Sequence, residues 1–337
     1  MNILLVNYEY TLTGASRLLL RLAEHLRHSG HQVTASAAVP EPGPVKAMYQ
    51  ERGFTVLDPP FSGVFDLAIC NSVLTAPQLL ACAGRTKTIW WIHEGSIGLE
   101  YLLRDPAQRE AFARASVVVF PIEHLRDTIY RSFIYQYDQS RFVVIPGGIP
   151  PITAPGPRTF ASTEFRIVSV GSIYPRKKHE DLIRAMMLYA HPSARCIIAG
   201  KLFSLPDDCM RIIEANPQIF ELIGEIDNAA ALRLLATADV FCLPSNSEVQ
   251  PLTILEAAML ERPLLLSDLS VYEGMWRHGH NCLLYPVGAI GMLAQSIAML
   301  AANAELRTRL GAAARLTAAP YTEAALFARF DAVLLGL

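Results

Sequence analysis

The sequence shows no marked excess of charge of either sign and no long apolar run. Its 337 residues include 29 Lys and Arg against 31 Asp and Glu, which gives a formal net charge of -2. A charge so close to zero provides no global basic field, so we expect no nucleic-acid partner. No apolar run approaches the roughly 20 residues that a membrane-spanning helix needs.

The first residues also lack the pattern of an export signal. Residues 1–6 form a short apolar run with no basic segment before it, and Asn7, Tyr8 and Glu9 follow. A signal peptide needs a basic start and a longer apolar core, so this run predicts a first β-strand instead. We therefore expect a cytoplasmic protein that is neither exported nor integral to a membrane.

Metal-binding and disulfide patterns are absent as well. The six cysteines have no metal-type spacing, and several fall within apolar runs, so they indicate reduced core residues of a cytosolic protein. These cysteines are Cys70, Cys82, Cys196, Cys209, Cys242 and Cys282. The sequence has no Asp-x-Asp motif and no His/Cys cluster of ligand spacing, so we expect neither a metal nor another cofactor.

The length and composition suit two domains. A chain of 337 residues exceeds one typical domain, and its 52% hydrophobic against 18% charged residues indicate a well-packed globular protein. Residues 150–157 are rich in proline and form the clearest linker. We therefore predict a first domain at residues 1–150, a linker at 151–160 and a second domain at 161–318.

Predicted strands and helices alternate along the chain. The first strand covers residues 3–7, a helix runs from Gly14 to about residue 29, and a second strand covers residues 32–37. Such alternation builds a parallel sheet, in which ligands bind outside the carboxyl ends of the strands. Asn71, His93 and Glu94 each follow a predicted strand, so we expect them to face one cleft.

The most informative stretch runs from Ser245 to Leu260, after an apolar strand at residues 238–244 and into an Ala/Leu/Met helix. The start of a helix offers unpaired N–H groups and a positive dipole end, which suit a nucleotide diphosphate. Carboxylates beside a phosphate would repel it, so Glu248 and Glu256 are expected to accept hydrogen bonds from sugar or ribose hydroxyls. This arrangement is typical of a nucleotide-sugar site.

Glu256 has a second interpretation. Thr253-x-x-Glu256 is also a capping box, in which Glu256 would bond only the backbone of its own helix. The residues alone leave both interpretations open.

A family resemblance adds to this picture. Glu248 and Glu256 are separated by seven residues within PSNSEVQPLTILEAAMLERPLLLSD, which resembles the E-x7-E element of the retaining GT-B glycosyltransferases of family GT4. The resemblance implies an α/β fold of GT-B type, with two Rossmann-like doubly wound parallel-sheet domains facing across a cleft. It further implies that residues 319–337 form a helix that returns to the first domain.

Three consecutive cations, Arg176, Lys177 and Lys178, follow a predicted strand at residues 165–171. They could form a solvated surface run, or they could provide the countercharge for a diphosphate. The family pattern aligns Arg176 and Lys177 with its Arg/Lys pair, which implies that they bind the diphosphate and stabilise the charge that develops as it departs. Ser172 departs from the frequent Gly-Arg form, and Lys178 is left without a role.

The resemblance implies the remaining site residues. His93 lies within the Trp-Ile-His-Glu segment at residues 91–94, which resembles the strand end whose His contacts the donor sugar, although a lone His is more often packed or solvated. Gly14 is implied to approach the donor phosphate closely, although a glycine that only permits a turn explains it too. Asn71 and Glu94 are implied as acceptor contacts. The implied donor-binding residues are Gly14, Gly171, Ser172, Ile226, Gln250, Pro251, Leu252, Thr253 and Glu256.

The predicted helix that begins at Gly14 carries Arg17, Arg21 and Arg27 among leucines. A solvated face accounts for these arginines. The sharper alternative is contact with an anionic lipid or a lipid-linked acceptor, which would place the protein at the inner membrane face as a peripheral protein.

By resemblance, the reaction moves a sugar from a nucleotide-diphosphate donor to a hydroxyl of a carbohydrate or lipid-linked carbohydrate with retention of configuration, without a metal. Its catalytic residues are implied to be His93, Arg176, Lys177 and Glu248. A non-catalytic nucleotide-sugar-binding partner subunit and a GT-B epimerase remain alternatives. A nicotinamide or flavin oxidoreductase would need a complete Gly-rich fingerprint, which the sequence lacks.

Overall fold

The computed structural model of the protein describes residues 1–61, 63–152 and 164–337. The chain forms two compact units: unit 1 comprises Met1–Gly148 and Glu323–Leu337, and unit 2 comprises Ile149–Thr322. Most of the predicted linker, residues 153–160, lies outside the described residues.

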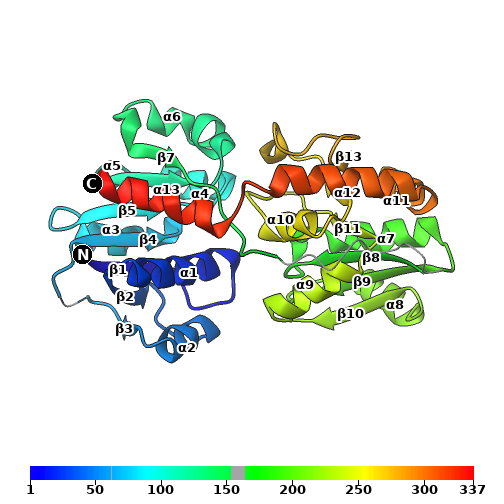
Figure 1. Ribbon diagram of the computed structural model, residues 1–337, viewed down its shortest axis with the longest axis horizontal. Coiled ribbons are helices and arrows are strands. Elements are labelled where there is room, and N and C mark those ends of the chain that lie inside the picture. Colours follow the sequence, from blue (N-terminus) through cyan, green and yellow to red (C-terminus); the bar gives the residue numbers. More distant parts are fainter. Residues whose placement is uncertain (62, 153–163) are drawn as a thin grey trace. The chain divides into compact units, whose positions relative to one another are not determined.

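Unit 1 is built on a parallel sheet of seven strands in the order β3-β2-β1-β4-β5-β6-β7 (Figure 1). The strands are β1 (Asn2–Asn7), β2 (Gln32–Ala37), β3 (Thr55–Leu57), β4 (Leu67–Asn71), β5 (Lys87–Trp91), β6 (Val117–Phe120) and β7 (Phe142–Val144). The strand order reverses beside β1, which pairs with β2 on one side and β4 on the other. This is a doubly wound, Rossmann-like sheet.

Helices cover this sheet: α1 (Gly14–His28), α2 (Pro44–Glu51), α3 (Ala76–Cys82), α4 (Ser96–Arg104), α5 (Pro106–Arg114), α6 (Arg131–Ile134) and α13 (Glu323–Leu335). The helix α1 begins after Thr13, whose side chain accepts a hydrogen bond from the Ser16 N–H at 3.2 Å. Such a cap satisfies one of the N–H groups that a helix start leaves unpaired. Leu19, Leu22 and Leu26 are fully buried on the inner face of α1.

The late helix α13 belongs to unit 1, although unit 2 precedes it in the sequence. The Arg21 guanidinium on α1 lies 2.7 Å from the Glu323 carboxylate, and His25 Nε2 lies 2.9 Å from the Asp331 carboxylate. Arg21 and His25 of α1 therefore make contacts within the unit. Arg27 also donates to the Arg52 carbonyl at 2.6 Å.

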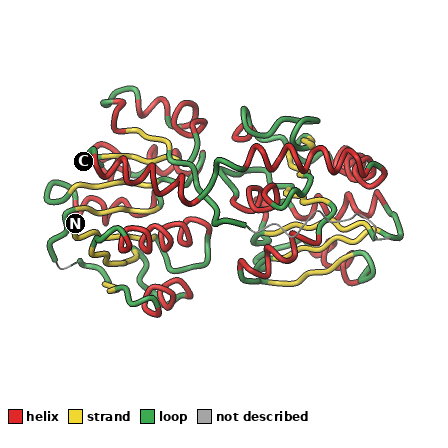
Figure 2. Tube along the Cα trace, viewed as in Figure 1, coloured by secondary structure: helices red, strands yellow, loops and turns green. Residues whose placement is uncertain are grey.

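Unit 2 is built on a parallel sheet of six strands in the order β10-β9-β8-β11-β12-β13. The strands are β8 (Phe165–Val170), β9 (Ala194–Ala199), β10 (Phe220–Gly224), β11 (Val240–Leu243), β12 (Leu264–Ser267) and β13 (Leu283–Tyr285). The helices are α7 (His179–Tyr189), α8 (Asp207–Ala215), α9 (Asn228–Thr237), α10 (Leu252–Met259), α11 (Ile290–Ala302) and α12 (Ala304–Ala318). Figure 2 shows the strands of each unit side by side with helices against them.

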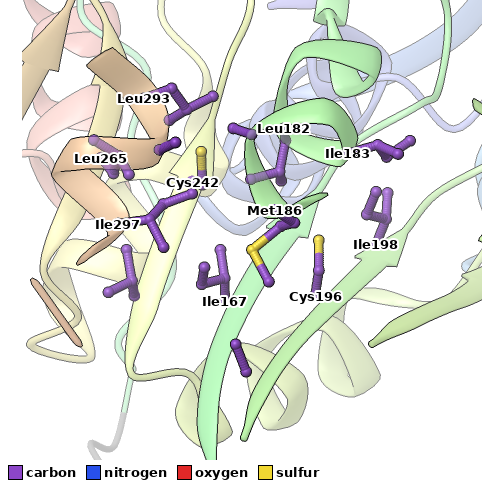
Figure 3. Close-up of a cluster of buried hydrophobic side chains, with 14 of the residues drawn as sticks. Ile167, Leu182, Ile183, Met186, Cys196, Ile198, Cys242, Leu265, Leu293 and Ile297 are labelled. Carbon is purple, nitrogen blue, oxygen red and sulfur yellow. The ribbon is translucent and has the colours of Figure 1, made fainter. Parts of the chain in front are cut away.

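The core of unit 2 lies where strands meet helices. Leu182 and Met186 from α7 and Ile297 from α11 pack with Cys196 and Cys242 from the sheet (Figure 3). All six cysteines lie in the described part of the chain, and all are buried, which confirms that they are core residues.

Close backbone packing joins the ends of β8 and β9 at two glycines. Gly200 has φ +154°, and a Cβ there would lie 2.0 Å from the Gly171 carbonyl oxygen. Gly200→Ala therefore adds a backbone clash to the strain of this φ value. We expect it to lower the free energy of unfolding by about 3 kcal/mol or more, measured by chemical denaturation.

Gly224→Ala is the matched control for this substitution. Gly224 is the last residue of the neighbouring strand β10 and has φ +83°, but nothing lies within 4 Å of its added Cβ. Gly224→Ala should lower the free energy of unfolding by about 1–2 kcal/mol, because it adds only the strain of a side chain at this φ value. Equal losses for the two variants would contradict the role of close packing at Gly200.

Candidate functional site

Two loops of unit 2 meet at the carboxyl ends of adjacent strands. The first follows β8, the second follows β11, and the two strands pair in parallel. The Asn246 N–H donates to the Arg176 carbonyl at 2.9 Å and ties the loops together. The carboxyl ends of parallel strands thus bring residues that are far apart in the sequence to one place.

Glu248 stands at the centre of this junction. Its side chain is only 6% exposed, and its carboxylate lies 2.6 Å from Lys177 Nζ and 3.2 Å from the Arg176 guanidinium. The Ser245 hydroxyl donates to the same carboxylate at 2.6 Å. The structure therefore brings together Arg176, Lys177 and Glu248, as expected for one site.

The electrostatics of this cluster favour an anion. Burial by itself would raise the pKa of Glu248, but the charges of Lys177 and Arg176 outweigh it and hold the pKa below its usual range. Glu248 is therefore ionised, and two cations against one carboxylate leave one positive charge in excess. The cluster can therefore attract an anionic ligand, and the Glu248 carboxylate can accept hydrogen bonds from hydroxyl groups.

The two cations are held in different ways. The Arg176 guanidinium lies over the Tyr174 ring at 5.3 Å, contacts the Tyr174 hydroxyl and donates to the Ser247 carbonyl. The side chain of Lys177 is 12% exposed against 39% for Arg176. Arg176 thus stands nearer to solvent, and Lys177 lies deeper.

Gly171 and Ser172 lie beside this cluster. A Cβ on Gly171 would lie 3.8 Å from Lys177 Nζ, so the lysine passes close to the glycine. Ser172 is half-buried on the same loop. Tyr174 and Gly200, which support this loop, were not singled out from the sequence, because neither contact is visible in the local pattern.

The start of α10 tests the capping-box interpretation of Glu256. Pro251 occupies the N-cap of α10, and among the described residues no side chain caps this helix. Thr253 is the second residue of α10 and not its N-cap, so the capping-box alternative for Glu256 is wrong. The capping box would need Thr253 at the N-cap, but the helix begins at Leu252 and Pro251 holds that position.

Glu256 instead has a partner outside its own helix. Its side chain is buried, and the Asn228 amide donates to its carboxylate at 2.7 Å. Asn228 begins α9, two residues after the half-buried Ile226. The structure therefore connects Glu256 with the segment that follows β10. Gln250, Pro251, Leu252 and Thr253 form the approach to α10 and its first turn.

A second group of predicted residues lies in unit 1. The Asn71 amide oxygen lies 2.7 Å from His93 Nε2, and the Asn71 amide nitrogen donates to the Ala15 carbonyl at 3.1 Å. Gly14, the first residue of α1, is exposed next to Ala15. The ends of β4 and β5 and the start of α1 therefore hold Gly14, Asn71 and His93 near one another.

Glu94 has contacts of another kind. Its carboxylate accepts hydrogen bonds from the Ser72 hydroxyl at 2.5 Å, the Val73 N–H at 2.9 Å and the His93 N–H at 3.0 Å. Burial raises the pKa of Glu94, although these bonds oppose the shift. Glu94 thus anchors the ends of β4 and β5, a role that the sequence did not reveal. Its role as an acceptor contact stays a prediction.

Over residues 1–61, 63–152 and 164–337, no three His, Cys, Asp or Glu side chains gather as a metal site. Within the same ranges, every helix is too short or too polar to traverse a bilayer.

The sequence and the fold resemble those of known glycosyltransferases. Residues 154–317 match the family model described as Glycosyl transferases group 1.

The alpha-galactosylglucosyldiacylglycerol synthase of Streptococcus pneumoniae is 34% identical over 119 residues, or 34% of this chain and 31% of the synthase. The phosphatidyl-myo-inositol mannosyltransferase of Mycobacterium leprae is 32% identical over 92 residues, or 27% of this chain and 25% of that enzyme. The match spans less than a third of either relative.

A solved structure shows the fold of the whole chain. The crystal structure of HepE from Anabaena in complex with UDP-glucose has a TM-score of 0.83 and covers 100% of both chains at 16% identity. Together with the two Rossmann-like sheets, this similarity shows the GT-B fold. The match to the model described as Glycosyl transferases group 1 thus falls in the second half of a chain that has the GT-B fold.

Proposed function

We propose that this protein is a retaining, GT4-type glycosyltransferase that moves a sugar from a nucleotide diphosphate to a hydroxyl group. One observation carries the proposal. A buried, ionised carboxylate, Glu248, is paired with Lys177 and Arg176 at the carboxyl ends of β8 and β11, within the glycosyl transferases group 1 domain. The excess positive charge suits the diphosphate, and the carboxylate suits the sugar hydroxyls.

In this proposal each group of residues has its own task. Arg176 and Lys177 bind the diphosphate and stabilise the negative charge that grows as the bond to the sugar breaks. Glu248 binds hydroxyls of the donor sugar, and Glu256, oriented by Asn228, binds the ribose hydroxyls. No metal is required, because the two cations and the start of α10 supply the countercharge.

The acceptor side of the proposal concerns unit 1. His93 orients the donor sugar, and Asn71, Glu94 and the exposed Gly14 border the acceptor. The names of the two relatives refer to a glycosylated diacylglycerol and to phosphatidyl-myo-inositol, which favours a lipid-linked acceptor. We accordingly place the enzyme in the cytoplasm, with peripheral contact at the inner membrane face.

Donor binding and turnover test the proposal together. Thermal unfolding is measured with UDP-, GDP- and ADP-linked sugars, because a ligand at 100 times its dissociation constant adds about 2.7 kcal/mol to the stability of the folded state. Release of the nucleoside diphosphate is then followed for the donor that stabilises. Slow release without an acceptor supports the enzyme, tight binding without release favours the partner subunit, and no binding at all overturns both.

The role of Glu256 leads to a separate prediction. Glu256→Gln replaces the buried carboxylate with an amide, so we expect the affinity for the nucleoside diphosphate to fall about ten- to a hundredfold, measured by calorimetry. Asn228→Ala should shift the affinity in the same direction. The control Glu214→Gln changes an exposed carboxylate on α8 and should leave the affinity unchanged. Unchanged affinity for Glu256→Gln would contradict the ribose assignment.

A further inference from the structure

The contacts of Asn71 determine which way its amide group points. The Asn71 Nδ2 atom lies 3.1 Å from the Ala15 carbonyl oxygen, and Oδ1 lies 2.7 Å from His93 Nε2. A backbone carbonyl only accepts hydrogen bonds, so the amide nitrogen must face Ala15. The amide oxygen must therefore face the imidazole of His93.

This orientation determines the protonation of the imidazole. The Asn71 oxygen accepts hydrogen bonds and has no proton to give, so His93 Nε2 must carry the N–H. A neutral imidazole has one N–H, which leaves Nδ1 with a free lone pair. Burial lowers the pKa of His93 to about 3, so the ring is neutral at physiological pH. In the described part of the chain, no group bonds to Nδ1.

We propose that Asn71 is a positioning residue that holds His93 in its Nε2–H tautomer and thereby presents Nδ1 as a hydrogen-bond acceptor for a substrate hydroxyl. The assignment of that hydroxyl to a sugar rests on the proposed function, whereas the tautomer does not. In this state His93 has no proton to donate to a phosphate oxygen or a leaving group. Its free Nδ1 can instead accept a hydrogen bond from an alcohol hydroxyl.

The surroundings keep the ring in place. Trp91 lies against it with ring centroids 4.8 Å apart and an interplanar angle of 42°, and Phe330 from α13 supports Trp91 at 4.7 Å. The carboxylate of Glu94 accepts the backbone N–H of His93 and is directed at the backbone rather than at the ring nitrogens. The neutral Asn71 is the only described side chain that bonds to the ring.

Nuclear magnetic resonance measures the tautomer directly. The full chain is labelled with ¹⁵N-histidine, and the His93 signals are identified by their loss in His93→Gln. We expect a protonated Nε2 and an unprotonated Nδ1 from about pH 8 down to about pH 5. Asn71→Asp places a carboxylate beside the ring, which favours the imidazolium, so titration should then appear within this range. An Nδ1–H tautomer in the wild-type protein, or its titration within this range, would overturn the proposal.

A pair of substitutions tests what Nδ1 binds. The amide of His93→Asn occupies the place of Nδ1, whereas the amide of His93→Gln reaches the place of Nε2. His93→Asn should therefore keep the KM for the donor within about tenfold of the wild-type value, and His93→Gln should raise it further. The reverse order would contradict the role of Nδ1. If the spectra show the Nε2–H tautomer but no nucleotide sugar reacts, the proposed function fails while the tautomer stands.

Discussion

Lys177→Ala should lower the rate of sugar transfer by about 100- to 1,000-fold and change the affinity for the donor by less than tenfold. Lys177 is 12% exposed and lies 2.6 Å from the Glu248 carboxylate, so its charge acts where solvent screens little. The departing diphosphate is more negative in the transition state than in the bound donor, so the loss should appear mainly in the rate. Single-turnover kinetics and a binding titration measure the two quantities separately.

Lys178→Ala is the matched control because it removes the same charge from the adjacent position. Lys178 pairs with Glu180 at 3.1 Å and not with Glu248. We expect its transfer rate to stay within about threefold of wild type, as for a partly exposed ion pair. Since Lys177→Ala also leaves the buried Glu248 with one cation fewer, its thermal unfolding is measured in parallel. Equal losses of rate and affinity in Lys177→Ala would contradict a role specific to the transition state.

Phe330→Ala should lower the free energy of unfolding of unit 1 by about 3–5 kcal/mol. The Phe330 side chain is fully buried, and its ring centroid lies 4.7 Å from that of Trp91. Truncation leaves a cavity beside Trp91, which is itself fully buried and packs against the ring of His93. Chemical denaturation measures the loss, and the tryptophan fluorescence reports on the same site.

Leu335→Ala provides the control on the same helix. Leu335 is 91% exposed, so its removal should change the free energy of unfolding by no more than about 0.5 kcal/mol. A similar small change for Phe330→Ala would show that α13 adds little to the stability of unit 1.

The sequence predicted the strands better than the contacts between them. Apolar runs and the proline and glycine residues that interrupt them locate most strands to within one or two residues, because strands buried on both faces are continuously apolar. The ion pair between Lys177 and Glu248 joins residues 71 positions apart. Their chemistry was visible in the sequence, but their mutual neutralisation depends on the pairing of β8 with β11, which no local pattern encodes.

Two long-range contacts could not be predicted from the sequence, and the physical reason is the same for both. Thr253 and Glu256 have the spacing of a capping box, but Pro251 caps α10 and Glu256 bonds to Asn228, 28 positions earlier. Arg21 on α1 was expected in solvent or at a lipid surface, but it pairs with Glu323, 302 positions later. A local sequence pattern is compatible with several side-chain partners, and the tertiary structure determines which of them the side chain contacts.

The location of α13 sets an order of events during biosynthesis. The ribosome releases the strands of unit 1 first and then must make all of unit 2 before Phe330 emerges to cover Trp91. Until then Trp91 on the nascent first sheet lacks the ring that packs against it. Each unit has its own sheet, but unit 1 cannot finish folding until unit 2 has been translated, because α13 follows unit 2 in the sequence.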